Sequence, residues 1–194
     1  MEGENPDPAN IVSYAIKTWN EASGESEKTK DGGTSSSLPT VWSPPARDFL
    51  KVNVDAGSVR DMGSGLGAII RDSDGQVCAC ATWQGRECWE VVIAEAKAVV
   101  FGLKLANEVG ARRLVEESDC LTVIQSFREA AKGTSAFHML LDDILELSST
   151  FDDVIWSFVR REGNKIAHEL AHFQPFVVYS PIVLLNLLQF HCFY

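Results

Sequence analysis

The sequence predicts an α/β protein with a mixed five-stranded sheet, whose first three strands are antiparallel and whose faces carry helices. Two observations predict this fold. Three strand-like segments come first, two of them joined by a tight-turn sequence, and strand and helix patterns alternate in the chain that follows. Consecutive hairpin strands followed by such alternation are typical of mixed sheets covered by helices.

The first strand is predicted at residues 50–57, LKVNVDAG, because apolar and polar residues alternate there with a period of two. Residues 63–72 and 76–85 are two more apolar runs. The sequence DSDG at 72–75 joins them and has the composition of a tight hairpin turn. These three strands are therefore expected to be consecutive and antiparallel.

Helical spacing of apolar residues begins at residues 89–111, where Gly110 is a plausible C-cap. A short strand should follow, and then a helix at 119–133 that Ser118 or Asp119 would cap. The remaining expected elements are a helix at 135–151, a strand at 152–162 and a short helix at 164–173.

The chain divides into three parts. Residues 1–40 include a polar Gly/Ser-rich stretch, so we expect a disordered N-terminal segment. Residues 41–174 form the expected domain. Residues 175–194 have no charged side chain and are interrupted by Pro181 and Asn186. This tail is compatible with a membrane anchor, a helix packed on the domain or an aberrant C-terminus.

Composition limits the classes of function. A net charge of −10 excludes a protein held to nucleic acid by a large basic surface, but not an enzyme whose carboxylates bind metal ions. Five cysteines without a CxxC pair favour a reducing, intracellular compartment, nuclear or cytoplasmic, and the acidic N-terminus does not resemble a secretory signal. We expect a monomer without a small-molecule cofactor.

Three acidic residues stand in otherwise apolar elements. Asp55 lies in the first strand, Glu95 on the first helix and Asp119 after the fourth strand. Each alone is interpreted as a cap or a solvated residue, since an isolated buried carboxylate is costly. The three residues together predict a bound cation, and Mg²⁺ prefers such hard oxygen ligands.

The sequence also contains H-E-x-x-H, formed by His168, Glu169 and His172. On a helix this spacing places two imidazoles on one face, as in zinc peptidases. A peptidase needs a third ligand, and the extended motif fails because Pro175 and Val178 stand where Gly and His are required. The match is interpreted as accidental.

The ordered series "LKVNVDAG…GLGAIIRDSDG…AEAKAVVFGLKLA…VEESDCLTVI…VRREGNKIAHELA" resembles the plant-type ribonuclease H-like domain, a type 1 ribonuclease H relative associated with non-LTR retroelements. The resemblance runs from about Trp42 to His172. It implies a ribonuclease H-like five-stranded sheet and hydrolysis of the RNA strand of RNA–DNA hybrids with Mg²⁺ or Mn²⁺.

When the family's positions are matched to this sequence, the resemblance implies that Asp55, Glu95 and Asp119 are the catalytic metal ligands. The last family carboxylate falls four residues after Asn164, where this chain has His168. Neutral imidazole should weaken one magnesium site, since it suits softer metals. We expect Asp55 to bridge two ions, Glu95 and Asp119 each to complete one, and His168 to act as a weak ligand or proton shuttle.

Hybrid recognition should depend on backbone geometry and 2′-hydroxyl groups. The competing interpretation of the fold is a nucleic-acid-binding domain with weak or no activity, although three retained carboxylates favour an enzyme. Each candidate side chain also has the simpler interpretation of a solvated surface group. The candidate nucleic-acid contacts are Arg71, Lys97, Arg160, Arg161, Asn164 and Lys165.

Overall fold

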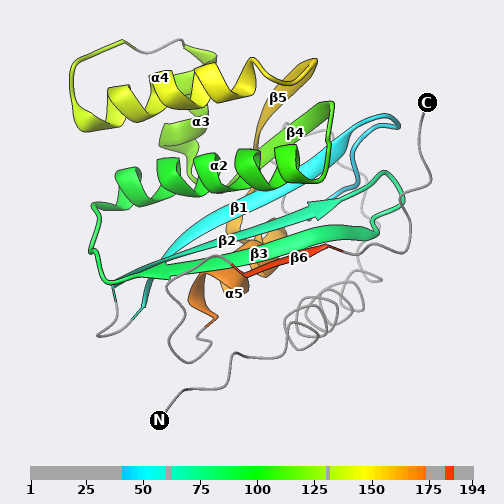
Figure 1. Cartoon of the computed structure of the whole chain (residues 1–194), viewed down its shortest axis with the longest axis horizontal. Helices are drawn as coiled ribbons and strands as arrows, with labels where there is room; N and C mark the ends of the chain where they lie inside the picture. The colour runs from blue at the N-terminus through cyan, green and yellow to red at the C-terminus, as the bar shows by residue number, and fades with distance from the viewer. Residues whose placement is uncertain (1–40, 60–62, 130–131, 174–181, 186–194) are drawn as a thin grey trace, which may run out of the picture.

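A computed structural model describes residues 41–59, 63–129, 132–173 and 182–185. One mixed sheet has the strand order β5-β4-β1-β2-β3-β6 (Figure 1). Its strands are β1 (Leu50–Val59), β2 (Gly63–Arg71), β3 (Val77–Gly85), β4 (Arg113–Ser118), β5 (Asp153–Phe158) and β6 (Ile182–Leu185).

The five predicted strands are confirmed, and so is the antiparallel arrangement of the first three. β1 pairs antiparallel with β2, and β2 with β3, while β4 runs parallel to both β1 and β5. The predicted hairpin turn is present, since the Asp72 carboxylate accepts hydrogen bonds from the backbone N–H groups of Asp74 and Gln76. The turn fixes the β2–β3 register and so the antiparallel start of the sheet.

Helices cover both faces of the sheet (Figure 1). α2, α3 and α4 lie on one face, and α5 lies on the other, over β1 and β2. Alternation along β1 separates the two faces: Val52 and Val54 pack toward Gly102 of α2, and Asp55 faces α5. The bounds are α2 (Val91–Glu108), α3 (Leu121–Arg128), α4 (Ala136–Ser148), the 3₁₀ turn η2 (Arg161–Gly163) and α5 (Lys165–His172).

Both predicted helix caps are displaced by one or two residues. α2 ends at Glu108 with Val109 as its C-cap, and the predicted Gly110 follows one residue further on, with a φ of 73° and its N–H bonded to the Asn107 carbonyl. The N-cap of α3 is Cys120 and not Ser118 or Asp119. Ser118 instead accepts a hydrogen bond from the Cys120 N–H just before the helix. Asp119 therefore has no capping role, and its carboxylate is available for other contacts.

α5 lies unusually close to the sheet, over two glycines. A Cβ atom on Gly67 of β2 would come within 2.3 Å of the Ala167 carbonyl oxygen and 2.4 Å of the Ala171 nitrogen. On Gly57 of β1 it would come within 2.5 Å of the His172 ring. Only residues without a side chain fit at these positions. Gly67 therefore sets the distance between α5 and the sheet, and Gly57 leaves room for the His172 ring.

Four residues of the apolar tail form a strand that the sequence did not predict. Residues 182–185 form β6, which pairs antiparallel with β3 at the sheet edge, so the sheet has six strands in place of five. The rest of the tail and residues 1–40 lie outside the described residues. In the part of the chain that the structure describes, no helix is long and apolar enough to cross a membrane.

Candidate functional site

The three predicted carboxylates meet at one place. Asp55 comes from β1, Glu95 from the first turns of α2, and Asp119 from the residue after β4. One carboxylate oxygen from each lies within 4.8 Å of the other two. Asp55 is only 3% exposed, and Glu95 and Asp119 are partly buried. The parallel β1 and β4 place Asp55 and Asp119 near each other, and α2 brings Glu95 from the adjacent layer.

Burial and mutual repulsion make this cluster unfavourable when all three residues are ionised. Burial raises the pKa of Asp55 to about 9, with further contributions from the negative charges of Glu95 and Asp119. Burial and Asp119 raise the pKa of Glu95 to about 8. Among the described residues, none donates a hydrogen bond to the buried Oε2 atom of Glu95. Close carboxylates with an unsatisfied oxygen fit a hard divalent cation.

His168 lies beside this cluster, on α5. Its Nδ1 atom is 2.8 Å from Asp55 Oδ2, and its two ring nitrogens are 3.1 and 3.0 Å from an Arg161 guanidinium nitrogen. Burial, together with the positive charges of His172 and Arg161, lowers the pKa of His168. The imidazole is therefore favoured in its neutral form, in which a ring nitrogen can accept a proton or bind a metal.

Two of the six candidate nucleic-acid contacts lie at the carboxylates. The exposed Arg161 lowers the pKa of both Asp55 and Glu95 through its positive charge, so its guanidinium lies near them. Asn164 is buried, and its Nδ2 atom donates to Asp119 Oδ1 at 3.1 Å and to the Val54 carbonyl at 2.8 Å. Arg161 thus lies at the edge of the carboxylate cluster, whereas Asn164 orients Asp119.

Arg71 does not lie at the surface, contrary to its predicted role in phosphate binding. It is 2% exposed, its guanidinium stacks 3.7 Å from the centre of the Trp42 ring, and it donates to Asn53 Oδ1 at 2.6 Å. Burial lowers its pKa to about 9, against the opposing effect of Glu117. Arg71 is thus a structural residue.

Arg71 is part of a larger buried polar network under Trp42, which we call the Trp42 network. Lys51 Nζ lies 3.1 Å from Glu117 Oε2, and Asn53 Nδ2 donates to Glu117 Oε1 at 3.1 Å. Asn53 also donates to Asn164 Oδ1 at 3.2 Å, which connects the network to the residue that orients Asp119. In the sequence, the alternating polar residues of β1 predict a strand with one polar face, but they do not predict this buried network.

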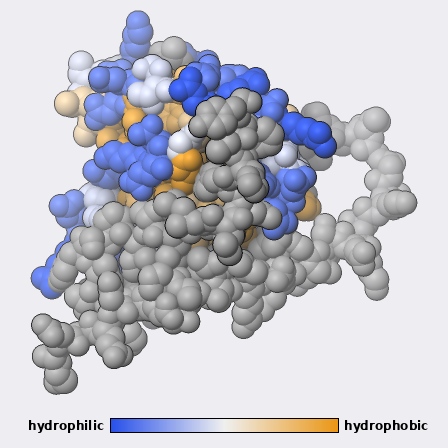
Figure 2. Space-filling view, turned by 45° about the vertical axis from the view of Figure 1, so that its right-hand side comes forward, coloured by the Kyte–Doolittle hydropathy of each residue, from blue (hydrophilic) through white to orange (hydrophobic). Residues whose placement is uncertain are grey.

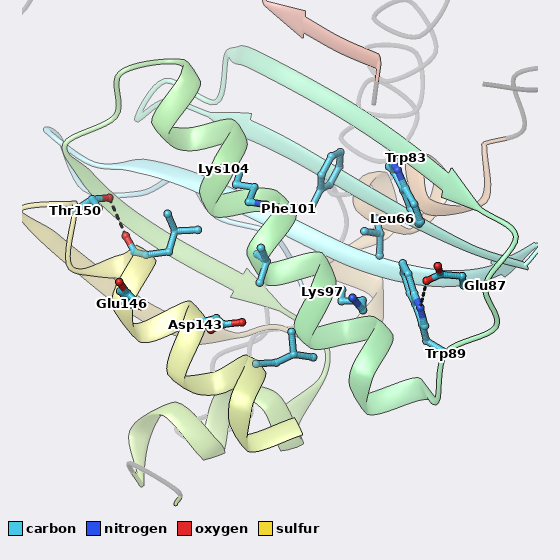
Figure 3. Close-up of a pocket in the computed structure, with 13 residues that line it drawn as sticks. Leu66, Trp83, Glu87, Trp89, Lys97, Phe101, Lys104, Asp143, Glu146 and Thr150 are labelled. Carbon is cyan, nitrogen blue, oxygen red and sulfur yellow. Dashed lines mark hydrogen bonds between the residues drawn. The ribbon is translucent and has the colours of Figure 1, made fainter. Parts of the chain in front are cut away.

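Lys97 lies away from the carboxylates. It lines a groove of about 790 Å³ between α2 and α4, with its Nζ atom 4.6 Å from the centre of the Trp89 ring (Figure 3). Trp89 stacks on Trp83 at 5.2 Å, and Asp143 and Glu146 of α4 face the groove. Arg160 and Lys165 are exposed. On the face seen in Figure 2, hydrophilic side chains cover most of the described surface, with hydrophobic atoms between them.

His172 belongs to a second group of side chains, which shares Asp55 with the carboxylate cluster and which the sequence did not predict. Asp55, His168 and His172 each offer a ligand atom within 4.8 Å of the other two. The sequence did contain one sign of this group, because the i, i+4 spacing of the two histidines places them on the same face of a helix. Their partner is more distant: Asp55 precedes His168 by 113 residues, and only the packing of α5 on β1 joins them.

Solved structures with the same arrangement define the fold class. RNase H1 of the archaeon Halobacterium salinarum has a TM-score of 0.58 and 22% identity, covering 63% of this chain and 94% of that one. The N-terminal RNase H domain of a Mycobacterium tuberculosis protein has a TM-score of 0.55 and 23% identity, with 63% and 90% coverage. LC11-RNase H1 from compost, solved with an RNA/DNA hybrid, has a TM-score of 0.56 and 16% identity, with 62% and 92% coverage. The fold is that of ribonuclease H.

A family model described as reverse transcriptase-like matches residues 53–174, more than half of the chain. The chain therefore belongs to the reverse transcriptase-like family and contains a ribonuclease H-like domain. A search of curated proteins found no match. The matched range begins at Asn53, just before Asp55, and ends after α5, so it includes all three carboxylates and both histidines.

Proposed function

We propose that this protein is a metal-dependent endonuclease that hydrolyses the RNA strand of RNA–DNA hybrids. The observation that carries the proposal is the convergence of Asp55, Glu95 and Asp119 within 4.8 Å in a partly buried site. Such a cluster is electrostatically unfavourable on its own and becomes favourable when divalent cations bind. Similarity to RNase H1 structures, one of them solved with an RNA/DNA hybrid, supports the choice of substrate.

The three carboxylates would hold Mg²⁺ or Mn²⁺, with Asp55 central because it also contacts His168. Bound divalent ions supply an activated water and neutralise the charge that develops on the phosphate. Asn164 keeps one oxygen of Asp119 oriented through its 3.1 Å hydrogen bond. These roles require that Asp55 and Glu95 lose their protons, so metal affinity should rise with pH.

Arg161 and His168 would act on the substrate side of the carboxylates. Arg161 is exposed and provides a planar cation that suits a phosphate oxygen. His168 is held by Asp55 and Arg161, and its neutral ring can accept or donate a proton at the rim of the site. Arg160 and Lys165, also exposed, are proposed as further contacts to the hybrid backbone.

The deciding experiment is cleavage of an end-labelled RNA–DNA hybrid with Mg²⁺ or Mn²⁺. Asp55→Asn should reduce the cleavage rate by more than about 10²-fold, the scale found for a preorganised electrostatic group. Asp142→Asn is the matched control, because it makes the same change at an exposed position on α4. RNA duplex and DNA duplex of the same sequence measure selectivity for the hybrid.

Equal cleavage by the wild type, Asp55→Asn and Asp142→Asn would exclude catalysis at this cluster. No cleavage by the wild type with either ion, combined with binding of the hybrid, would favour the alternative of a nucleic-acid-binding domain without turnover.

A further inference from the structure

A second group of metal-ligating side chains shares Asp55 with the carboxylate cluster. Asp55, His168 and His172 offer one ligand atom each, all within 4.8 Å of one another. The two imidazole rings have centroids 4.2 Å apart, and they come from consecutive turns of α5. In the sequence, the H-E-x-x-H motif lacks a third ligand. In the fold, the β1 carboxylate stands where that ligand is needed.

The hydrogen bonds of His172 prepare its ring for metal binding. Its Nδ1 atom lies 2.8 Å from the carbonyl oxygen of His168, and a carbonyl only accepts, so Nδ1 carries the proton. The lone pair is then on Nε2, which is the usual arrangement in a metal-binding histidine supported by a backbone carbonyl. His172 is exposed, so an ion can reach it from solvent.

The backbone of β1 is shaped to receive this ring. Gly57 has no Cβ atom, and a methyl group added there would lie 2.5 to 2.9 Å from three atoms of the His172 imidazole. Gly57 is two residues beyond Asp55 and on the same face of β1. The ring is therefore seated on the strand, beside the carboxylate, and the two ligands have a defined separation.

We propose that Asp55, His168 and His172 form a binding site for a borderline transition-metal ion, of which Zn²⁺ is the best fit. Two imidazole nitrogens and one carboxylate oxygen match the preference of Zn²⁺ for nitrogen-rich sites, and they leave one position open. Mg²⁺ prefers oxygen ligands only, so the two ions choose different partners around Asp55. Glu95 and Asp119 belong to the magnesium set and not to this one.

Sharing of Asp55 has a functional consequence that rests on the proposed function. An ion on the histidines occupies an oxygen of Asp55, so Zn²⁺ should compete with Mg²⁺ and inhibit cleavage of the hybrid. His172→Ala should make cleavage less sensitive to Zn²⁺, because His172 takes part only in the zinc site.

The test is calorimetric titration of the metal-free protein with Zn²⁺, together with the visible absorption of its Co²⁺ form. Every variant carries Cys88→Ser and Cys192→Ser, because thiols also bind zinc. We expect one Zn²⁺ per chain and the strong absorption of a low-coordinate Co²⁺ site. His172→Ala should weaken binding by more than roughly 100-fold, since even supporting groups are worth about 10–100-fold. His138→Ala is the matched control, because it removes a histidine that bonds to Ser135 on α4.

Glu95→Gln separates this inference from the proposed function. It should weaken Mg²⁺ binding and leave Zn²⁺ binding in place. Zinc binding that survives both His168→Ala and His172→Ala, or that Glu95→Gln abolishes, would overturn the histidine site. Zinc bound at His172 without hybrid cleavage in any ion would contradict only the proposed function. Cleavage without zinc binding would contradict only the histidine site.

Discussion

Two buried polar regions lie on the same face of β1 and differ in how their charges are balanced. In the Trp42 network, Lys51 pairs with the carboxylate of Glu117, and Arg71 donates to Asn53, which itself donates to Glu117. Two residues beyond Asn53, Asp55 faces the carboxylates of Glu95 and Asp119. The first region brings opposite charges together, and the second brings together only groups that become negative when they ionise.

This difference in charge shows that burial of polar groups alone does not identify a functional site. Lys51 and Arg71 are buried like Asp55, yet their hydrogen bonds serve the fold. The carboxylate cluster is distinguished by the like charges that its three acidic residues carry when they ionise. Asn164 connects the two regions, because it bonds to both Asn53 and Asp119. The Trp42 network therefore supports the geometry of the carboxylate cluster.

The largest effect should follow from unbalancing the Trp42 network. Glu117→Ala leaves Lys51 and Arg71 buried without their carboxylate, and the loss of one partner of a buried ion pair costs about 3–5 kcal/mol. Glu117→Gln keeps groups that can bond to Asn53 and Ser157, so it should cost less. Urea denaturation of both variants measures this difference, and equal stability of Glu117→Ala and the wild type would refute the structural role.

The carboxylate cluster should behave in the opposite way to Glu117. Ionisation of its carboxylates should destabilise the metal-free protein, because the negative charges repel one another. Folding raises the pKa of Asp55 to about 9 and of Glu95 to about 8. The folded state then holds protons that the unfolded state has lost, so stability falls as pH rises from about 4 through about 9. The loss should exceed about 1.4 kcal/mol, the value of one pKa unit.

This pH dependence is measured by urea denaturation in a chelator and again with Mg²⁺, which should restore stability at high pH. Asp55→Asn should flatten the pH profile in the chelator, and the exposed Asp142→Asn should not. A wild-type profile in chelator that does not fall toward high pH would mean that the three carboxylates do not repel one another as their spacing implies.

A smaller effect is expected from Trp42→Phe. The substitution keeps an aromatic ring over Arg71 and removes the 2.9 Å hydrogen bond from the indole Nε1 to Asn53 Oδ1. The loss of one partly buried hydrogen bond costs about 1 kcal/mol, which thermal unfolding detects. Trp42→Ala also removes the ring and should cost more. Equal midpoints for wild type, Trp42→Phe and Trp42→Ala would mean that Trp42 does not stabilise the network.

The sequence predicted the elements whose patterns are local. Strands β1 to β5 followed from apolar runs and alternation, and the C-cap of α2, Val109, lies one residue before the predicted Gly110. β6 was missed because four apolar residues inside an uncharged, mostly apolar tail have no distinguishing period. The α3 cap was wrong because Ser118, Asp119 and Cys120 are adjacent, and pattern alone places a helix end only within a few residues.

The candidate site was predictable in part. Asp55, Glu95 and Asp119 stood out as acids in apolar segments and matched a family pattern. The prediction for Arg71 was wrong because a charged residue at a strand end is usually solvated, and only the fold shows Trp42 covering it. The pairing of Asp55 with His172 depends on contacts between residues far apart in the chain, which periodicity does not report.

The two glycines under α5 imply that the proposed histidine site depends on the free space above the strands. A single methyl group on Gly67 would meet the α5 backbone, and one on Gly57 would meet the His172 ring. The first would lift the helix that carries both histidines, and the second would displace the His172 ring, while the carboxylates on β1, α2 and β4 kept their places. Homologous chains could thus gain or lose a nitrogen-ligated ion without altering any ligand, through a substitution in the strand beneath.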